Sequence, residues 1–269
     1  MTSTSSALEG FARDSFAALG VSRDVWRLGD GPAVIVIAEI PGITPLVLSF
    51  ARRVAAEGMS VALPHLFGDD GREPKGSYLL GSFARACVSR EFTVLATGKS
   101  SPVVEWLRAL ARAEHARAGG PGVGVVGMCF TGGFALAMMA GAPVVAPVLS
   151  QPSLPFSIGA RRAADLGCSA TELAAIHAKV SDGAQVLGLR FTGDPAVKAA
   201  RFESLRRELG DAFLAVEIDS SPGNQFGHRK GAHSVLTEDL VDRVGSPTMA
   251  ALHRVLDFLA SKLEVVRDP

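Results

Sequence analysis

The chain has 269 residues, of which 48% are hydrophobic and 20% charged, a composition typical of a folded globular protein rather than a disordered one. Its 27 basic residues balance its 27 acidic residues, so charge gives no reason to expect nucleic acid or an anionic membrane as a partner. Three cysteines, Cys87, Cys129 and Cys168, show no metal-ligand spacing and indicate a reducing compartment without a disulfide framework.

The beginning of the chain is polar and contains acidic residues within its first dozen positions, which is not the pattern of a signal peptide. We expect residues 1–20 to be a polar extension and residues 1–269 to form one cytoplasmic domain. Residues 122–150 carry no charge, but glycines and prolines interrupt this stretch repeatedly. It therefore predicts the buried centre of a soluble sheet rather than a membrane span.

Strand-like and helix-like segments alternate along the chain. Apolar runs predict strands at 24–28, 33–40, 59–68, 122–128, 143–150, 184–191 and 212–218. Helical periodicity predicts helices at 45–58, 101–117, 132–139, 170–180, 195–209 and 247–263, and the polar stretch 68–80 predicts a long loop. This alternation predicts a mostly parallel sheet in one α/β domain, with the chemistry in loops at the carboxyl ends of the strands.

Cys129 lies between the predicted strand 122–128 and the predicted helix 132–139. This is the topology of a nucleophile elbow, in which a sharp strand-to-helix turn exposes a reactive side chain. Gly127 permits a tight turn, although Thr131 stands where the G-x-C-x-G pattern has its second glycine. A helix N-terminus beneath the thiol would favour its ionisation. The alternative is that Cys129 is simply a small buried hydrophobe.

An acid and a histidine follow in the order that such sites use. Asp194 follows the predicted strand 184–191, although an aspartate before Pro195 is also an ordinary helix cap. Between the last predicted strand and the last predicted helix lie His228 and His233. We favour His233, because it lies in a short loop flanked by glycine and alanine, whereas His228 lies among polar neighbours.

Glu39 comes directly after the apolar run 33–38, at the carboxyl edge of a buried strand where an unpaired charge is costly. Taken alone, it could be a residue that reaches solvent from the end of the strand. Beside a thiol it could accept the thiol proton, and the backbone N–H groups of Ile40 and Phe130 could then form an oxyanion hole.

The segments VIVIAEIPGI, GMCFTGGFALAM, FTGDPAV and GAHSVL, in this order and spacing, resemble the dienelactone hydrolase family over nearly the whole chain after its first twenty residues. The resemblance implies an α/β-hydrolase fold of about eight strands, with helices on both faces of the sheet and no large cap domain. It implies a triad of Cys129, His233 and Asp194, with Glu39 activating the thiol when substrate binds. In that family the cysteine attacks esters and lactones, and the acyl-enzyme is hydrolysed by water that the histidine activates. We expect no cofactor and no metal.

The sequence departs from this family in its arginines. Studied members hold a substrate carboxylate with arginines, one of them four residues after the catalytic histidine, where this chain has Thr237. Arg90 is a candidate for another such arginine, and Arg85 lies near it, but both could equally be solvated charges on a helix. We therefore expect a small ester or lactone as substrate and poor recognition of a free carboxylate.

Two other classes of function compete with a cysteine-dependent ester or lactone hydrolase. One is a non-catalytic α/β-hydrolase-fold protein that binds a small ligand or a partner, a reading that Thr131 favours. The other is an amidotransferase-like or peptidase-like cysteine enzyme. The gap of about 40 residues from Asp194 to His233 argues against this second class. The sequence does not indicate an oligomeric state.

Overall fold

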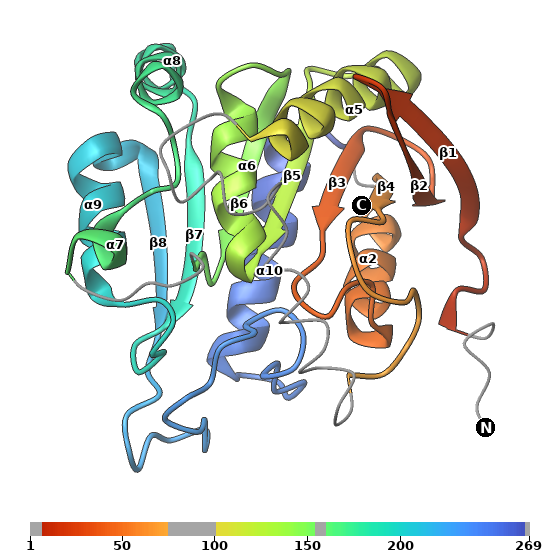
Figure 1. Cartoon of the computed structure of the whole chain (residues 1–269). Helices are drawn as coiled ribbons and strands as arrows, with labels where there is room; N and C mark the ends of the chain where they lie inside the picture. The colour runs from red at the N-terminus through yellow and green to blue at the C-terminus, as the bar shows by residue number, and fades with distance from the viewer. Residues whose placement is uncertain (1–6, 75–100, 154–159, 267–269) are drawn as a thin grey trace.

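The computed structural model describes residues 7–74, 101–153 and 160–266, and its centre is one eight-stranded sheet (Figure 1). The strands lie in the order β1-β2-β4-β3-β5-β6-β7-β8. The first two strands are antiparallel to their neighbours, and all the others are parallel. The strands are β1 (Ala12–Ala18), β2 (Val21–Leu28), β3 (Ala33–Ile37), β4 (Ser60–Pro64), β5 (Val123–Met128), β6 (Val144–Ser150), β7 (Val186–Phe191) and β8 (Phe213–Ile218).

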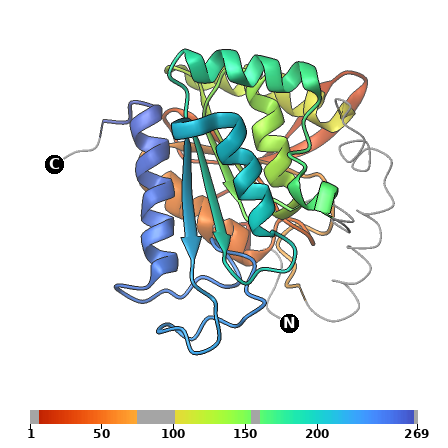
Figure 2. The ribbon, with the colours of Figure 1, turned by 90° about the vertical axis from the view of Figure 1, so that its left-hand side faces the viewer.

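Helices cover both faces of the sheet, as expected (Figure 2). One face packs against α2 and α10, and the other packs against α5, α6, α8 and α9. The helices are α2 (Pro45–Ala56), α5 (Pro102–Ala118), α6 (Gly132–Met139), α7 (Ala160–Ala164), α8 (Ala170–Ser181), α9 (Ala199–Leu209) and α10 (Pro247–Lys262), with 3-10 turns η2 (Cys129–Thr131) and η3 (Gly210–Ala212).

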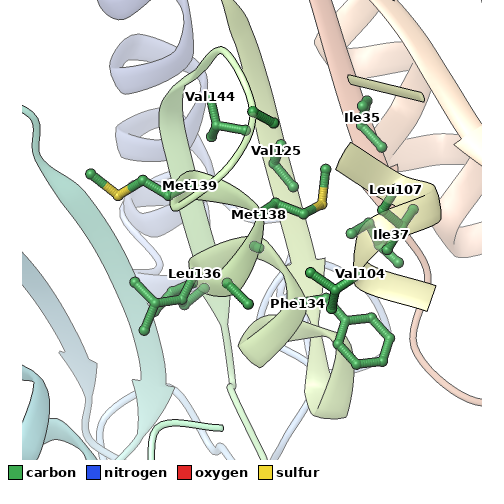
Figure 3. Packing of buried hydrophobic residues seen from close by; sticks show 14 of the residues in the cluster. Ile35, Ile37, Val104, Leu107, Val125, Phe134, Leu136, Met138, Met139 and Val144 are labelled. Carbon is green, nitrogen blue, oxygen red and sulfur yellow. The ribbon is translucent and has the colours of Figure 1, made fainter. Parts of the chain in front are cut away.

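The central strands are apolar throughout because both of their faces are covered. Along β3, Ile35 and Ile37 belong to the hydrophobic core on the α5 and α6 side, whereas Val34 and Val36 belong to the core on the other side. Figure 3 shows the first of these cores, where side chains of α6 and α5 meet those of β3 and β5. Such burial on two faces makes the centre of the sheet a rigid base for the loops at its edge.

The helices begin at residues suited to that position. Thr44 accepts a hydrogen bond from the N–H of Val47 at the start of α2, and Ser246 accepts one from Met249 at the start of α10. Proline occupies the first turn of α2, α5 and α10, where a missing N–H costs nothing.

Several elements differ from the sequence-based expectation: β2 begins three residues earlier, β3 and β4 end three and four residues earlier, and β1, α7 and α9 differ as follows. Strand β1 lies within residues 1–20, which were expected to be an extension; its residues are mostly exposed, so it lacks the apolar pattern of a buried strand. It is held by pairing with β2 and by Phe16, whose ring lies 5.4 Å from that of Trp106. Helix α7 was not predicted, and α9 begins at Ala199 rather than at residue 195.

No separate cap domain covers the sheet in the described ranges, which agrees with an α/β-hydrolase fold lacking a large cap. Within the same ranges, no helix has both the length and the apolar character needed to cross a membrane.

Candidate active site

Cys129 lies on a strained turn at the carboxyl end of β5, a central strand between β3 and β6. Its φ of 57° is in the left-handed region, which non-glycine residues seldom adopt outside functional turns. Gly127 makes this turn possible, because a Cβ at that position would lie 2.2 Å from the carbonyl oxygen of Thr131. The sequence therefore folds into the strand–turn–helix arrangement that presents a side chain above the edge of the sheet.

Thr131, where a glycine was expected, fits this turn without exposing its side chain. It is fully buried, and its hydroxyl accepts a hydrogen bond from the N–H of Met128 at 2.8 Å. The same hydroxyl lies 2.9 Å from the carbonyl oxygen of Ile37, so it connects the ends of β3 and β5. The position after the elbow that requires a glycine is Gly132 rather than residue 131, because a Cβ at Gly132 would lie 2.8 Å from Pro152. Thr131 thus packs beneath the elbow, and its presence no longer favours a non-catalytic protein.

Asp194 and His233 come from different loops and meet beside the elbow. His233 Nδ1 lies 2.6 Å from Asp194 Oδ2, and the Asp194 side chain is fully buried. The other carboxylate oxygen accepts a hydrogen bond from the N–H of Ala196 at 2.8 Å. Asp194 does not cap α9, whose N-cap is Lys198. The alternative explanation of Asp194 as a helix cap is therefore wrong.

His233 also contacts Cys129, and this contact changes its protonation. Burial alone would lower the pKa of His233, but hydrogen bonds to Asp194 and Cys129, together with their charges, raise it to about 11. Because Nδ1 faces Asp194, Nε2 is the nitrogen left for the sulfur. The raised pKa favours the protonated imidazole.

His228, the other candidate histidine, has different surroundings. Its backbone N–H and C=O are both hydrogen-bonded to the side chain of Asn224, and its ring centroid lies 5.1 Å from that of Phe191. Burial lowers the pKa of His228, and within the described part of the chain its Nε2 has no hydrogen-bond partner. These contacts describe a neutral, packed ring, whereas His233 is the histidine that the structure brings to Asp194 and Cys129.

Glu39 follows β3 by two residues and is only 7% exposed. Its Oε2 accepts hydrogen bonds from Ser234 Oγ at 2.7 Å and from Gln151 Nε2 at 3.1 Å, and its Oε1 accepts one from Thr237 Oγ1. All the hydrogen bonds that the structure describes for Glu39 therefore come from uncharged donors, and none comes from Cys129. Thr237, where relatives were expected to have an arginine, binds this carboxylate instead.

Ser153 was not identified from the sequence. Its Oγ lies 3.1 Å from Cys129 Sγ, and its N–H donates to the carbonyl oxygen of Cys129 at 3.0 Å. The residue is 6% exposed and lies just after β6, the neighbour of β5. A search for polar residues directly after each predicted strand, which found Glu39 and Asp194, would also have found Ser153.

Asp239 is a second residue that the sequence did not reveal. Its Oδ2 accepts hydrogen bonds from the backbone N–H groups of His233 at 2.7 Å and Ser234 at 3.1 Å. Arg229 binds both carboxylate oxygens of Asp239, at 2.9 and 3.2 Å. Burial raises the pKa of Asp239, but the bonds from Arg229 and from the two N–H groups outweigh burial and lower it. Asp239 thereby fixes the backbone that carries His233.

Of the remaining candidate site residues, the structure describes Phe130 and Ile40. Phe130 is the second residue of η2, and its ring lies 5.5 Å from that of Phe67. Ile40 directly follows Glu39. Arg85 and Arg90 lie outside the described residues. Over the described ranges, no group of three or more histidine, cysteine, aspartate or glutamate side chains is arranged to hold a metal ion.

The sheet order, the helices on both faces and the elbow after β5 define an α/β-hydrolase fold. The model of the dienelactone hydrolase family matches residues 17–263, and the chain belongs to that family, which is a family of hydrolases. No curated protein matches the chain.

Solved structures share this fold at low sequence identity. A protein from Klebsiella pneumoniae subsp. pneumoniae, assigned as a dienelactone hydrolase, is 20% identical with a TM-score of 0.59, covering 93% of this chain and 98% of that one. A cold-adapted esterase from an Arctic intertidal metagenomic library is 13% identical with a TM-score of 0.55, covering 93% and 92%. The dienelactone hydrolase-like promiscuous phosphotriesterase P91 from metagenomic libraries is 16% identical with a TM-score of 0.55, covering 93% and 98%.

Proposed function

We propose that this protein hydrolyses carboxylic esters or lactones of small molecules, with Cys129 as nucleophile, His233 as general acid and base, and Asp194 as the residue that orients His233. The observation that carries the proposal is the continuous contact from Asp194 through His233 to Cys129, with the cysteine on a strained elbow. Membership of the dienelactone hydrolase family supports the same reaction class. The free cysteines Cys129 and Cys168 support a reducing, cytoplasmic setting.

In the proposed reaction, Cys129 Sγ attacks the carbonyl carbon of the substrate and forms a tetrahedral intermediate. The N–H groups of Phe130 and Ile40 are proposed to stabilise its oxyanion. When the carbon–oxygen bond breaks, the departing alkoxide takes the proton from His233 Nε2, leaving a thioester. Neutral His233 then takes a proton from water, the hydroxide attacks the thioester, and the acid leaves as Sγ regains its charge.

The role of Glu39 as acceptor of the thiol proton stays a prediction. Its hydrogen bonds to Ser234 and Thr237 support a second role, because both residues lie just after His233 in the same loop. In this role the buried carboxylate holds the loop against the end of β3 and limits the movement of His233.

The test is hydrolysis of an activated aryl ester before and after treatment with iodoacetamide. We expect alkylation to abolish hydrolysis in the wild-type protein and in Cys168→Ala, because burial raises the pKa of the Cys168 thiol and keeps it unreactive. Cys129→Ala should be inactive from the start. Activity that survives in Cys129→Ala would refute the nucleophile, and a folded wild-type protein inactive on every ester and lactone tried would favour a non-catalytic binding protein.

A further inference from the structure

Two neighbouring strands, β5 and β6, are each followed by a non-glycine residue with a positive φ. The first is Cys129, and the second is Gln151, whose φ is 38°. Unlike Cys129, Gln151 is fully buried, which keeps its side chain out of direct contact with a substrate. Residues in this left-handed region persist where their surroundings fix them, and they cluster at functional sites.

The side-chain amide of Gln151 joins two segments of the site that are far apart in the sequence. Its Nε2 donates a hydrogen bond to Glu39 Oε2 at 3.1 Å, and its Oε1 accepts one from the backbone N–H of Val235 at 3.3 Å. Ser150 Oγ also donates to this Oε1. Glu39 lies two residues after β3 and Val235 two residues after His233, so one amide connects the end of β3 to the loop that carries His233.

The backbone around Gln151 is fixed to the strands on either side. Its N–H donates to the carbonyl oxygen of Leu189 in β7 at 2.7 Å, and the N–H of Ser153 donates to the carbonyl oxygen of Cys129 at 3.0 Å. The amide is therefore presented from a segment that is bound both to β7 and to the elbow.

An amide suits this position because it is a donor and an acceptor at once. The carboxylate of Glu39 only accepts, so it requires the N–H of Nε2, whereas the N–H of Val235 requires an acceptor. A glutamate in place of Gln151 would offer acceptors alone and bring a second carboxyl group to Glu39. A methionine would offer neither contact and would leave buried polar groups without a partner.

We propose that Gln151 is a positioning residue: its amide holds Glu39 and the His233 loop in one arrangement and thereby fixes His233 relative to Cys129. The inference rests on the proposed function, in which His233 gives a proton to the leaving group and takes one from water. Both transfers require hydrogen-bond distance, so a displacement of the loop by about 1 Å lowers turnover more than it lowers affinity for the substrate.

The test combines steady-state hydrolysis of an activated aryl ester with hydrogen exchange of single backbone amides, measured by NMR. In Gln151→Met we expect kcat to fall at least about tenfold while KM stays within about twofold of wild type, because no substrate contact is lost. The N–H of Val235 should exchange at least about tenfold faster, because it has lost its acceptor. The exchange measurement needs no ester, so it is independent of activity.

Ser246→Ala is the matched control. Ser246 is fully buried, and its Oγ accepts from the N–H of Met249 at 3.1 Å and donates to the carbonyl oxygen of Val241 at 2.6 Å, in the same connection between β8 and α10. This variant should have a lower Tm, with kcat and the exchange rate of Val235 close to wild type. An equal fall of kcat in Ser246→Ala would show that general loss of stability is the cause, and it would overturn the role of Gln151.

Exchanging the two partners tests the contact itself. Gln151→Glu keeps the shape of the side chain and the acceptor for Val235 but loses the donor to Glu39, so kcat should fall as in Gln151→Met. Adding Glu39→Gln restores a donor and an acceptor with their places exchanged. Glu39→Gln should therefore raise the Tm of Gln151→Glu but not that of the wild-type protein.

A folded Gln151→Met with the kcat of wild type would overturn the inference. If Gln151→Met does not fold, the exchanged pair decides, because an equal effect of Glu39→Gln on the Tm in both backgrounds would refute the contact. A folded wild-type protein that hydrolyses no ester would refute the proposed function, and faster exchange of Val235 in Gln151→Met would then still show that Gln151 holds the loop.

Discussion

His233 and His228 lie in the same loop region but have different surroundings, and these surroundings favour different roles for the two residues. His233 lies between Asp194 and Cys129, and its pKa is raised to about 11, whereas burial lowers the pKa of His228 against Phe191. A charged imidazole can give a proton to a leaving group, whereas His228 is a packed ring whose Nε2 has no hydrogen-bond partner among the described residues.

We therefore expect His233→Ala to lower kcat for an activated aryl ester by roughly 100-fold or more, since general acid–base assistance is typically of this size. His228→Ala serves as the control and should leave the kcat of the folded protein close to wild type, with its cost appearing as a lower Tm. Steady-state kinetics and thermal unfolding of both variants give the comparison. If His228→Ala were the slower enzyme, the base would have to be reassigned to that residue.

At the scale of elements, two carboxylates, Asp239 and Glu39, hold the loop between β8 and α10 in place. Asp239 accepts hydrogen bonds from the backbone N–H groups of His233 and Ser234 and is held by Arg229, so the backbone that carries His233 is fixed. Glu39 holds the following residues, Ser234 and Thr237, from the end of β3. The loop thus lacks regular secondary structure, but hydrogen bonds to two carboxylates hold the backbone and side chains of residues 233–237 in place.

The expected result for Asp239→Ala is a free energy of unfolding lower by about 1–3 kcal/mol at pH 7, because two backbone donors and Arg229 lose their acceptor. The native pKa of Asp239 is lowered, so its stabilisation is present above the ordinary carboxyl value of about 3.9 and is lost as the pH falls through the native value. Denaturant unfolding of both proteins between pH 3 and pH 8 should show the difference shrinking at the acid end.

Asp242→Ala provides the control for this loop. Asp242 pairs with Arg53, but its side chain is 64% exposed, so its removal should cost only about 0–1 kcal/mol. A pH-independent difference between wild type and Asp239→Ala would show that the carboxylate charge is not what anchors the His233 segment.

The features that can be predicted from the sequence are those that depend on residues close to them in the chain. Cys129 and Asp194 each come within three residues of the end of a buried strand, and parallel strands bring their carboxyl ends to one edge, so their proximity could be predicted. Asp239 could not be predicted, because its function depends on backbone groups that it meets only in the folded loop. Strand β1 was missed for a related reason: it is a mostly exposed edge strand and carries no apolar alternation.

At the scale of the whole molecule, the balance of charge gives an expectation about the substrates that the protein would select. Equal numbers of acidic and basic residues give no net field to attract an anion from solution. At the site, Thr237 presents a hydroxyl to Glu39 at the position where an arginine would have bound a substrate carboxylate.

We accordingly expect neutral short-chain esters or lactones to be turned over as well as, or better than, a lactone that carries a free carboxylate. The measurement is kcat/KM for a carboxylate-bearing lactone and for its methyl ester, each at low and high ionic strength. With no net charge to steer association, the value for the free acid should change little with salt. A preference for the free acid of more than ~100-fold, about 2.7 kcal/mol of transition-state stabilisation, would require a buried cationic site that binds the carboxylate, and Arg85→Ala and Arg90→Ala would then be the variants to measure.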